Sequence, residues 1–121
     1  MITADQLLAH AVGDYVLQTD WMARTKTSST IVALIHAFFY AIPFLLLSPS
    51  ALGLLVIVGT HFVIDRFRLA GLLNWLKNGL PRPRTATGFP ADRPEYLVVW
   101  LTIITDNILH IAINGAALRW L

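Results

Sequence analysis

Three histidine–aspartate pairs stand out in this chain because the two members of each pair are four residues apart. The pairs are His10 with Asp14, His61 with Asp65, and Asp106 with His110. In an α-helix this spacing places both side chains on one face, one turn apart. Imidazole and carboxylate groups without sulfur suit zinc, manganese or iron, and the chain contains no cysteine. The pattern therefore predicts a His/Asp site for a divalent metal, with zinc the first candidate.

The four histidines of the chain all lie inside strongly apolar segments. An ionisable side chain inside a membrane span costs about 2.5–3.5 kcal/mol, so each one needs a compensating role. If successive segments cross a membrane in alternating directions, the three paired aspartates lie nearer one surface, with their histidines about 5–6 Å deeper. His36 falls between these two levels. We expect one site, with the predicted ligands His10, Asp14, His36, His61, Asp65, Asp106 and His110.

Three charged residues are candidates for roles in catalysis. Asp14 or Asp20 could serve as general base. Arg68 follows Asp65 by three residues and His61 by seven, which places it on their helix face, where a guanidinium could hold a phosphate. Simpler interpretations stay open, since Asp20 could be a solvated helix cap and Arg68 a topology signal.

Amide side chains fall on the same helix faces as the predicted ligands. Gln6 and Gln18 continue the four-residue spacing of the first helix, and Asn114 continues that of the last. We expect them to form hydrogen bonds around the site. The alternative for the whole polar set is helix packing, in which such residues only pair with one another.

The composition predicts that these segments lie in a membrane. The chain has 121 residues, of which 56% are hydrophobic and 13% charged, with a mean hydropathy of +0.64. A soluble domain has about 25% charged residues, so a soluble globular enzyme is excluded. We predict an all-α fold in which residues 1–121 form a single transmembrane domain, a polytopic four-helix bundle with a buried His/Asp cluster. Its helices are predicted at about 3–23, 30–47, 50–78 and 93–120. The amphipathic residues 69–80 either continue the third helix or form a short helix in the membrane interface.

The distribution of lysine and arginine predicts the orientation. Eight of the nine basic residues lie in the loop at about 24–29, towards the end of the third helix, or in and beside the loop at about 79–92, and basic loops stay in the cytoplasm. Both termini are then outside. Topology and anionic lipids account for the pI near 9.4, so no nucleic acid partner is expected. Small residues such as Gly59 permit close packing between protomers, which leaves a homo-oligomer open.

The His/Asp segments also carry a family resemblance. Residues 8–20, His36, residues 60–65 and residues 106–110 resemble small bacterial and phage membrane proteins of unknown function, which usually have glutamine where this chain has Asn107. The chain is also distantly similar to LexA-regulated membrane-bound metal-dependent hydrolases, which carry comparable His-x-x-x-Asp pairs. The resemblance implies a multi-pass protein of the bacterial inner membrane and a metal-dependent hydrolase.

Three functions stay open at this point. The first is an intramembrane metal-dependent hydrolase of a lipid-linked phosphoester, with a site open to the cytoplasm or the lipid. The second is a transporter or channel for a metal ion or protons, since layered Asp and His also describe an ion path. The third is a structural or accessory subunit whose metal staples a small bundle. Residues 42–47 and 52–58 are wholly apolar, which favours a site open to one side over a path through the membrane.

Overall fold

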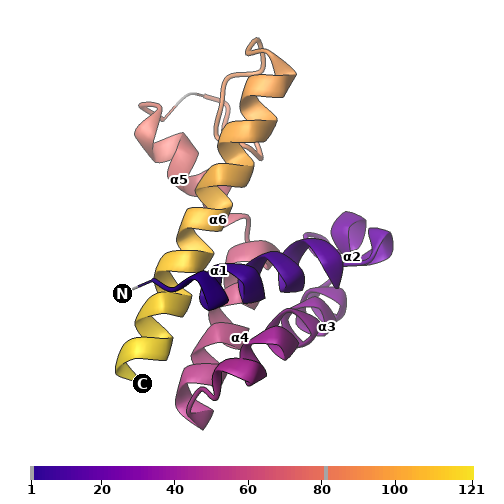
Figure 1. Ribbon diagram of the computed structural model, residues 1–121. Coiled ribbons are helices and arrows are strands. Elements are labelled where there is room, and N and C mark those ends of the chain that lie inside the picture. Colours follow the sequence, from indigo (N-terminus) through magenta and orange to yellow (C-terminus); the bar gives the residue numbers. More distant parts are fainter. Residues whose placement is uncertain (1, 81) are drawn as a thin grey trace.

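The computed structural model describes residues 2–80 and 82–121. Every regular element in these ranges is helical, so the predicted all-α class is confirmed. The α-helices are α1 (Ala4–Ala11), α2 (Asp20–Thr25), α3 (Thr30–Ala41), α4 (Ala51–Arg66), α5 (Leu69–Lys77) and α6 (Glu95–Trp120) (Figure 1). A π-helical turn, η1 (Val12–Val16), continues α1, and a 3-10 helix, η2 (Ile42–Leu47), continues α3.

Hydroxyl side chains begin four of these helices. In each case the side-chain oxygen accepts a hydrogen bond from a backbone N–H of the first turn, which would otherwise lack a partner. The four N-caps are Thr3, Thr19, Ser29 and Ser50. The change from α-helix to 3-10 helix after α3 coincides with Pro43, which has no N–H to continue the α-helical ladder.

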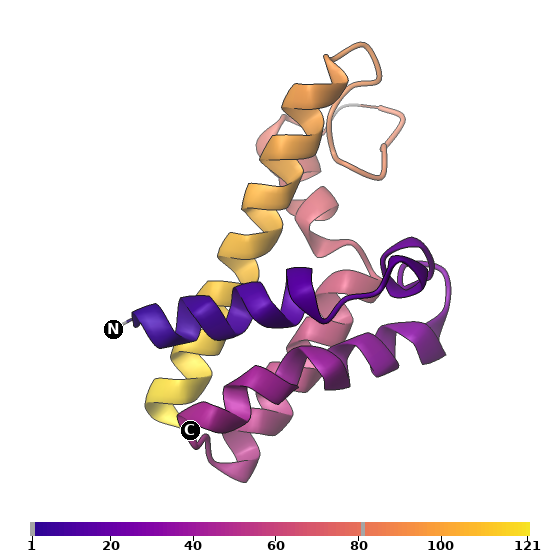
Figure 2. The same cartoon turned by 45° about the vertical axis from the view of Figure 1, so that its right-hand side comes forward.

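The structure divides two segments that the sequence predicts as single helices. Residues 3–23 form α1 and η1, then a break, after which α2 begins with Thr19 as its own N-cap. Residues 50–78 form α4 and α5, which are separated at Arg68, where the backbone is left-handed with φ of 52° (Figure 2). The other two predicted helices, 30–47 and 93–120, agree with α3 plus η2 and with α6.

Two helical segments in the described ranges are long and apolar enough to cross a membrane, namely Thr30–Leu47 and Glu95–Trp120. The sequence predicts four such spans. Helix α4 has 16 residues and is therefore about 24 Å long, less than the hydrocarbon core of about 30 Å. Helix length alone thus supports two spans, and the polytopic four-helix bundle is not established by it.

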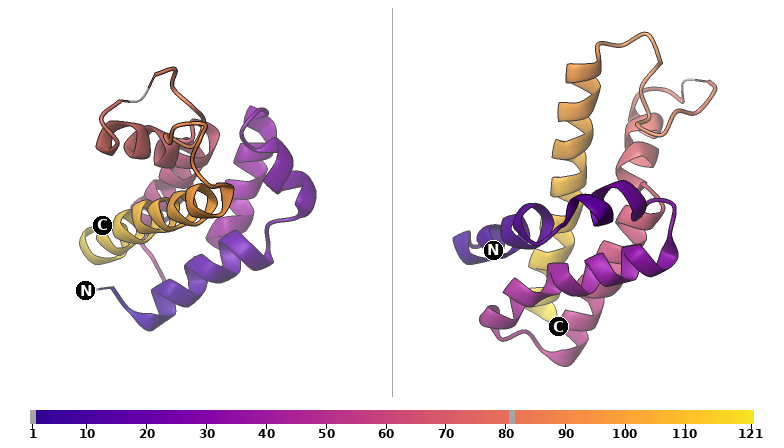
Figure 3. Two further views of the ribbon diagram at one scale, coloured as in Figure 1. Left: turned by 90° about the horizontal axis from the view of Figure 1, so that it is seen from above. Right: turned by 90° about the vertical axis from the view of Figure 1, so that its right-hand side faces the viewer.

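The helices pack against one another at different angles (Figure 1). Helices α3 and α4 form a hairpin, α4 packs along α6, and α1 crosses α6 at a steep angle (Figures 1 and 3). Helix α5 and the loop that follows it pack against the first turns of α6 and extend away from the other helices (Figure 2). Four elements, η1, α3, α4 and α6, therefore meet near the middle of the molecule.

Gly13 allows η1 to lie directly against the backbone of α3. A Cβ atom at this position would be 2.5 Å from the carbonyl oxygen of Tyr40. We therefore expect Gly13→Ala to lower the free energy of unfolding by about 1–3 kcal/mol, because the two backbones must separate.

Gly59→Ala is the matched control, since nothing lies within 4 Å of an added Cβ in the middle of α4. It should be neutral or stabilising by up to about 1 kcal/mol, because alanine favours helix over glycine. Unfolding of both variants in one detergent measures the difference. Equal changes at the two positions would argue against the close approach of η1 and α3.

Candidate metal centre

Six of the seven predicted ligands come together where η1, α3, α4 and α6 meet. Each of these elements contributes one or two of them: Asp14 from η1, His36 from α3, His61 and Asp65 from α4, and Asp106 and His110 from α6. All are buried except Asp106, whose side chain is 29% exposed. The convergence of these helices therefore creates one buried His/Asp cluster, as the spacing predicts.

The first possible ligand group consists of Asp14, His36, His61 and Asp65, with one donor atom of each within 4.8 Å of all the others. Asp65 Oδ2 lies 3.1 Å from His61 Nε2 and 3.3 Å from His36 Nε2. Asp14 Oδ1 lies 3.3 Å from the same nitrogen of His36. Two imidazoles and two carboxylates directed at one point form a donor set that suits zinc, manganese or iron.

The second possible group consists of Asp14, Asp106 and His110. His110 Nε2 lies 3.4 Å from Asp65 Oδ1 and 3.5 Å from Asp106 Oδ2. This nitrogen is buried, and in the part of the chain that the structure describes it lies within ion-pair distance of these carboxylates without a well-formed hydrogen bond. A buried nitrogen without such a bond is costly, and a bound cation would supply a partner. Because Asp14 belongs to both groups, the cluster has donors for one ion or for two that share this carboxylate.

The turn η1 determines where Asp14 lies. The N–H of Leu17 donates to the carbonyl of Val12, five residues earlier, at 2.9 Å. A π-turn of this kind is wider than an α-turn and is frequent at functional sites. It places Asp14 in the cluster while the preceding turn, which carries His10, faces other partners.

The structure does not bring His10 into either ligand group. Its Nδ1 lies 2.8 Å from the hydroxyl of Tyr40, and its Nε2 lies 2.8 Å from Oδ1 of Asn107. Both ring nitrogens are therefore engaged in hydrogen bonds, which leaves neither for a metal. His10 lies beside the cluster, and the centroid of its ring is 5.8 Å from that of His110.

The two other candidates differ in position. Asp20 begins α2, is 77% exposed in its side chain and forms an ion pair with Arg24, so the structure places it at the solvated helix end and apart from the cluster. Arg68 does reach the site. Its side chain lines the adjoining pocket and donates to the hydroxyl of Thr27 at 3.0 Å.

Tyr40 belongs to the site, although a search for histidine and carboxylate residues does not find it. It is completely buried, its ring stacks on that of His61 at 3.6 Å between centroids, and its hydroxyl accepts from Asn114 Nδ2 at 2.5 Å. His36 and Tyr40 are four residues apart, so the spacing rule that found the His/Asp pairs would also have found this His–Tyr pair. Asn114 thus has the supporting role predicted for it, whereas Gln6 donates to the carbonyl of Ile111.

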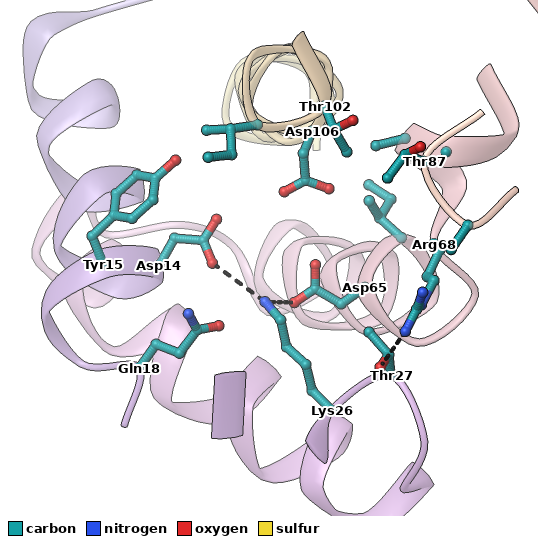
Figure 4. Close-up of a pocket in the computed structure, with 15 residues that line it drawn as sticks. Asp14, Tyr15, Gln18, Lys26, Thr27, Asp65, Arg68, Thr87, Thr102 and Asp106 are labelled. Atoms are coloured by element: carbon teal, nitrogen blue, oxygen red, sulfur yellow. Dashed lines mark hydrogen bonds and ion pairs between the residues drawn. The ribbon is translucent and has the colours of Figure 1, made fainter. Parts of the chain in front are cut away.

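Lys26 is a second site residue that the sequence did not indicate, since its charge alone predicts only orientation. Its ammonium donates to Asp65 Oδ2 at 2.7 Å and lies 3.3 Å from His36 Nε2 and 3.9 Å from Asp14 Oδ1. Figure 4 shows it between the two carboxylates. No helical periodicity links Lys26 to the cluster, because it follows α2 at the start of a loop.

A pocket of about 420 Å³ opens beside the cluster. Three carboxylates face it, those of Asp14, Asp65 and Asp106 (Figure 4). Its remaining lining combines basic and hydroxyl groups with apolar side chains, including Lys26, Thr27, Arg68, Thr87, Ile64 and Ile103. The cluster is therefore accessible from one side through a pocket of mixed polarity.

The comparison with curated proteins and the comparison with solved structures found no match. A protein-family model does match, over residues 2–117, which includes every residue of the His/Asp cluster. The family is described as proteins of unknown function, in agreement with the resemblance to small proteins of that kind. By this match, the chain belongs to the DUF3307 family of proteins of unknown function.

Proposed function

We propose that this protein is a membrane-embedded, metal-dependent hydrolase of a lipid-linked phosphoester. The observation that carries the proposal is the buried His/Asp cluster that opens onto a pocket with Arg68 in its wall. Asp14, His36, His61 and Asp65 would hold a divalent ion, with zinc the first candidate and manganese or iron the others. Such an ion supplies Lewis acidity for hydrolysis.

The apolar outer surface supports a place in the bilayer. Large apolar side chains on α3, α4 and α6 face outward, among them Phe38 at 63% exposure, Leu55 at 67% and Trp100 at 63%. Soluble monomers rarely expose large contiguous apolar surfaces. We place the protein in the bacterial inner membrane as a multi-pass protein, surrounded by lipids, with its basic loops in the cytoplasm and both termini outside.

The pocket lining suggests the class of substrate. Arg68 can form paired hydrogen bonds with a phosphate, and Ile64 and Ile103 offer apolar contact in the same pocket. A phosphate attached to an apolar chain would contact both the guanidinium group and the apolar side chains. A lipid would reach such a buried site from the bilayer more easily than a soluble metabolite would.

The proposed reaction is a hydrolysis. Water adds to phosphorus, the P–O bond to the lipid alcohol breaks, and the alcohol takes up the proton that the water gives up. Asp14 lines the pocket and lies in the cluster, so the carboxylate oxygen that would not bind the ion is our candidate for the general base. Arg68 holds the phosphate. Asp20 has no part in this scheme, because it lies at the exposed start of α2.

A transporter is less well supported by the packing. A buried apolar cluster that includes Phe44, Ile57 and Ala117 lies about one to two helical turns from the histidines of the same helices. Together with the apolar stretches 42–47 and 52–58, this cluster favours a site open to one side over a path through the membrane. Transport and a structural role for the metal are the outcomes that a negative hydrolysis test would favour.

Hydrolysis of phosphatidate and of a polyprenyl phosphate by the purified protein in detergent tests the proposal. We expect phosphate release that requires added zinc or manganese and that stops on chelation. In Arg68→Gln the KM should rise about tenfold or more, because a hydrogen bond to a charged group contributes about 1.5–3 kcal/mol.

Arg66→Gln is the matched control, since Arg66 has the same charge near the same helix end but donates to Thr27 and Thr30. Its KM should stay within about twofold of wild type, in the range usual for surface charges. A protein that binds metal but releases phosphate from neither lipid would overturn the hydrolase and leave the transport and structural functions.

A further inference from the structure

The ammonium group of Lys26 lies where the first ligand group would hold a cation. It is 2.7 Å from Asp65 Oδ2 and 3.3 Å from His36 Nε2, which are donor atoms of two residues of the group. Metal–ligand bonds to these atom types are about 2.0–2.2 Å long. An ion bound to both atoms from the side that the lysine occupies would lie well within contact distance of the lysine nitrogen, and two positive centres cannot share that space.

We propose that Lys26 and the metal ion are alternative occupants of the same position, and that metal binding moves the Lys26 ammonium into the adjoining pocket to bind phosphate with Arg68. The inference rests on the metal centre of the proposed function. It assigns Lys26 two states: internal counter-ion of the cluster without metal, and phosphate ligand with it.

The position of Lys26 in the chain allows this movement. It is the C-cap of α2, a helix of six residues, and a short loop connects it to α3. Its side chain is 15% exposed and already lines the pocket, so the ammonium can leave the cluster without crossing packed side chains. The flexible four-carbon stem of lysine permits such a change by rotation alone.

The pocket provides a second cation at the place to which Lys26 would move. Thr27, the next residue, accepts a hydrogen bond from Arg68 at 3.0 Å, so Arg68 lies beside the loop that carries Lys26, and both basic side chains line the pocket (Figure 4). A phosphate bound there would face the metal-filled cluster. The ligand class is a phosphate group, either free or in a lipid headgroup, and metal and phosphate should each strengthen the binding of the other.

Chemical labelling of lysine tests the exchange directly. The chain has only two lysines, Lys26 and Lys77, and Lys77 on α5 is exposed. We expect zinc or manganese chloride alone to increase the acylation rate of Lys26 about tenfold or more relative to Lys77, because the ammonium loses its charge-assisted hydrogen bond to Asp65. Mass spectrometry of isotope-coded peptides measures the ratio. An unchanged or slower rate in protein that has bound metal would overturn the inference.

Metal affinity gives a second, independent measurement. Lys26→Met removes the competing charge, so we expect it to bind zinc or manganese at least about tenfold more tightly than wild type. Arg24→Met is the matched control, because it removes one positive charge two residues away from an exposed ion pair with Asp20; its metal affinity should stay within about twofold. Equal or weaker metal binding by Lys26→Met would refute the competition.

Phosphate binding by the metal-loaded protein completes the test. Lys26→Met should bind inorganic phosphate, or phosphatidate in phosphatidylcholine vesicles, at least about tenfold more weakly than wild type. Loss confined to phosphatidate identifies the lipid headgroup as the ligand, and loss with both probes identifies the phosphate group itself. Unchanged binding of both would overturn the second state of Lys26.

The outcomes separate this inference from the proposed function. If metal releases Lys26 but no lipid is hydrolysed, the hydrolase fails and the exchange stands. If metal binds and Lys26 stays in place, the exchange fails and the metal centre stands. If neither wild type nor Lys26→Met binds metal, both fail. If only Lys26→Met binds metal, the competition is supported, while a metal-dependent activity of the wild type is overturned.

Discussion

Asp65→Asn should abolish metal binding. The carboxylate of Asp65 lies at the centre of the cluster: Oδ2 is 3.1 Å from His61 Nε2 and 3.3 Å from His36 Nε2, and Oδ1 is 3.4 Å from His110 Nε2. Loss of a residue that only supports a ligand lowers metal affinity about 10- to 100-fold, so loss of this charge should exceed about 100-fold. Titration with zinc and elemental mass spectrometry of the purified protein measure the effect.

The same substitution also disturbs the internal ion pair, so metal loss must be separated from unfolding. Without Asp65, the ammonium of Lys26 loses its partner at 2.7 Å, and breaking a buried pair costs about 3–5 kcal/mol. The double variant Lys26→Met/Asp65→Asn removes both charges and should regain most of that stability. It should still bind no metal. Metal binding by the double variant would show that Asp65 is not a ligand.

Asp14→Asn should lower the rate of phosphate release at least about 100-fold at saturating metal, since general base catalysis contributes about 10²- to 10⁴-fold. Asp14 belongs to both possible ligand groups and faces the pocket, so its carboxylate is the one most closely tied to a bound substrate. The rate with a lipid phosphate substrate, measured across a range of metal concentrations, separates the loss of the base from weaker metal binding.

Asp20→Asn provides the comparison, because Asp20 is exposed and paired with Arg24. It should keep wild-type phosphate release within about twofold, as surface charges usually do. The reverse result, loss with Asp20→Asn and retention with Asp14→Asn, would assign the general base to the residue that the structure places outside the pocket.

Much of the ligand set could be predicted because, within a helix, the spacing of two residues in the sequence determines whether they share a face. His61 with Asp65, and Asp106 with His110, each lie in one uninterrupted helix, so a separation of four residues was enough to place both side chains on one face. His10 and Asp14 have the same separation, but η1 begins between them. Spacing cannot reveal a π-turn, and the prediction for His10 depended on a regular helix.

Other features depend on contacts between distant segments. Lys26 reaches Asp65 across 39 positions of the chain, and nothing near Lys26 in the sequence records that contact. The left-handed backbone at Arg68 has no signal in the sequence, because non-glycine residues rarely adopt positive φ, although the amphipathic stretch 69–80 left a separate short helix open. Helices 30–47 and 93–120 were predictable because long apolar stretches with clear ends define them.

The π-turn η1 has a further consequence for how sequences of this type can vary. A π-turn contains about one more residue per turn than an α-helix, so η1 acts as a single-residue insertion at the end of α1. Removing one residue from 12–16 would turn the chain before it by about 100° relative to the chain after it. The length of this segment therefore fixes whether His10 meets Tyr40 while Asp14 meets His36.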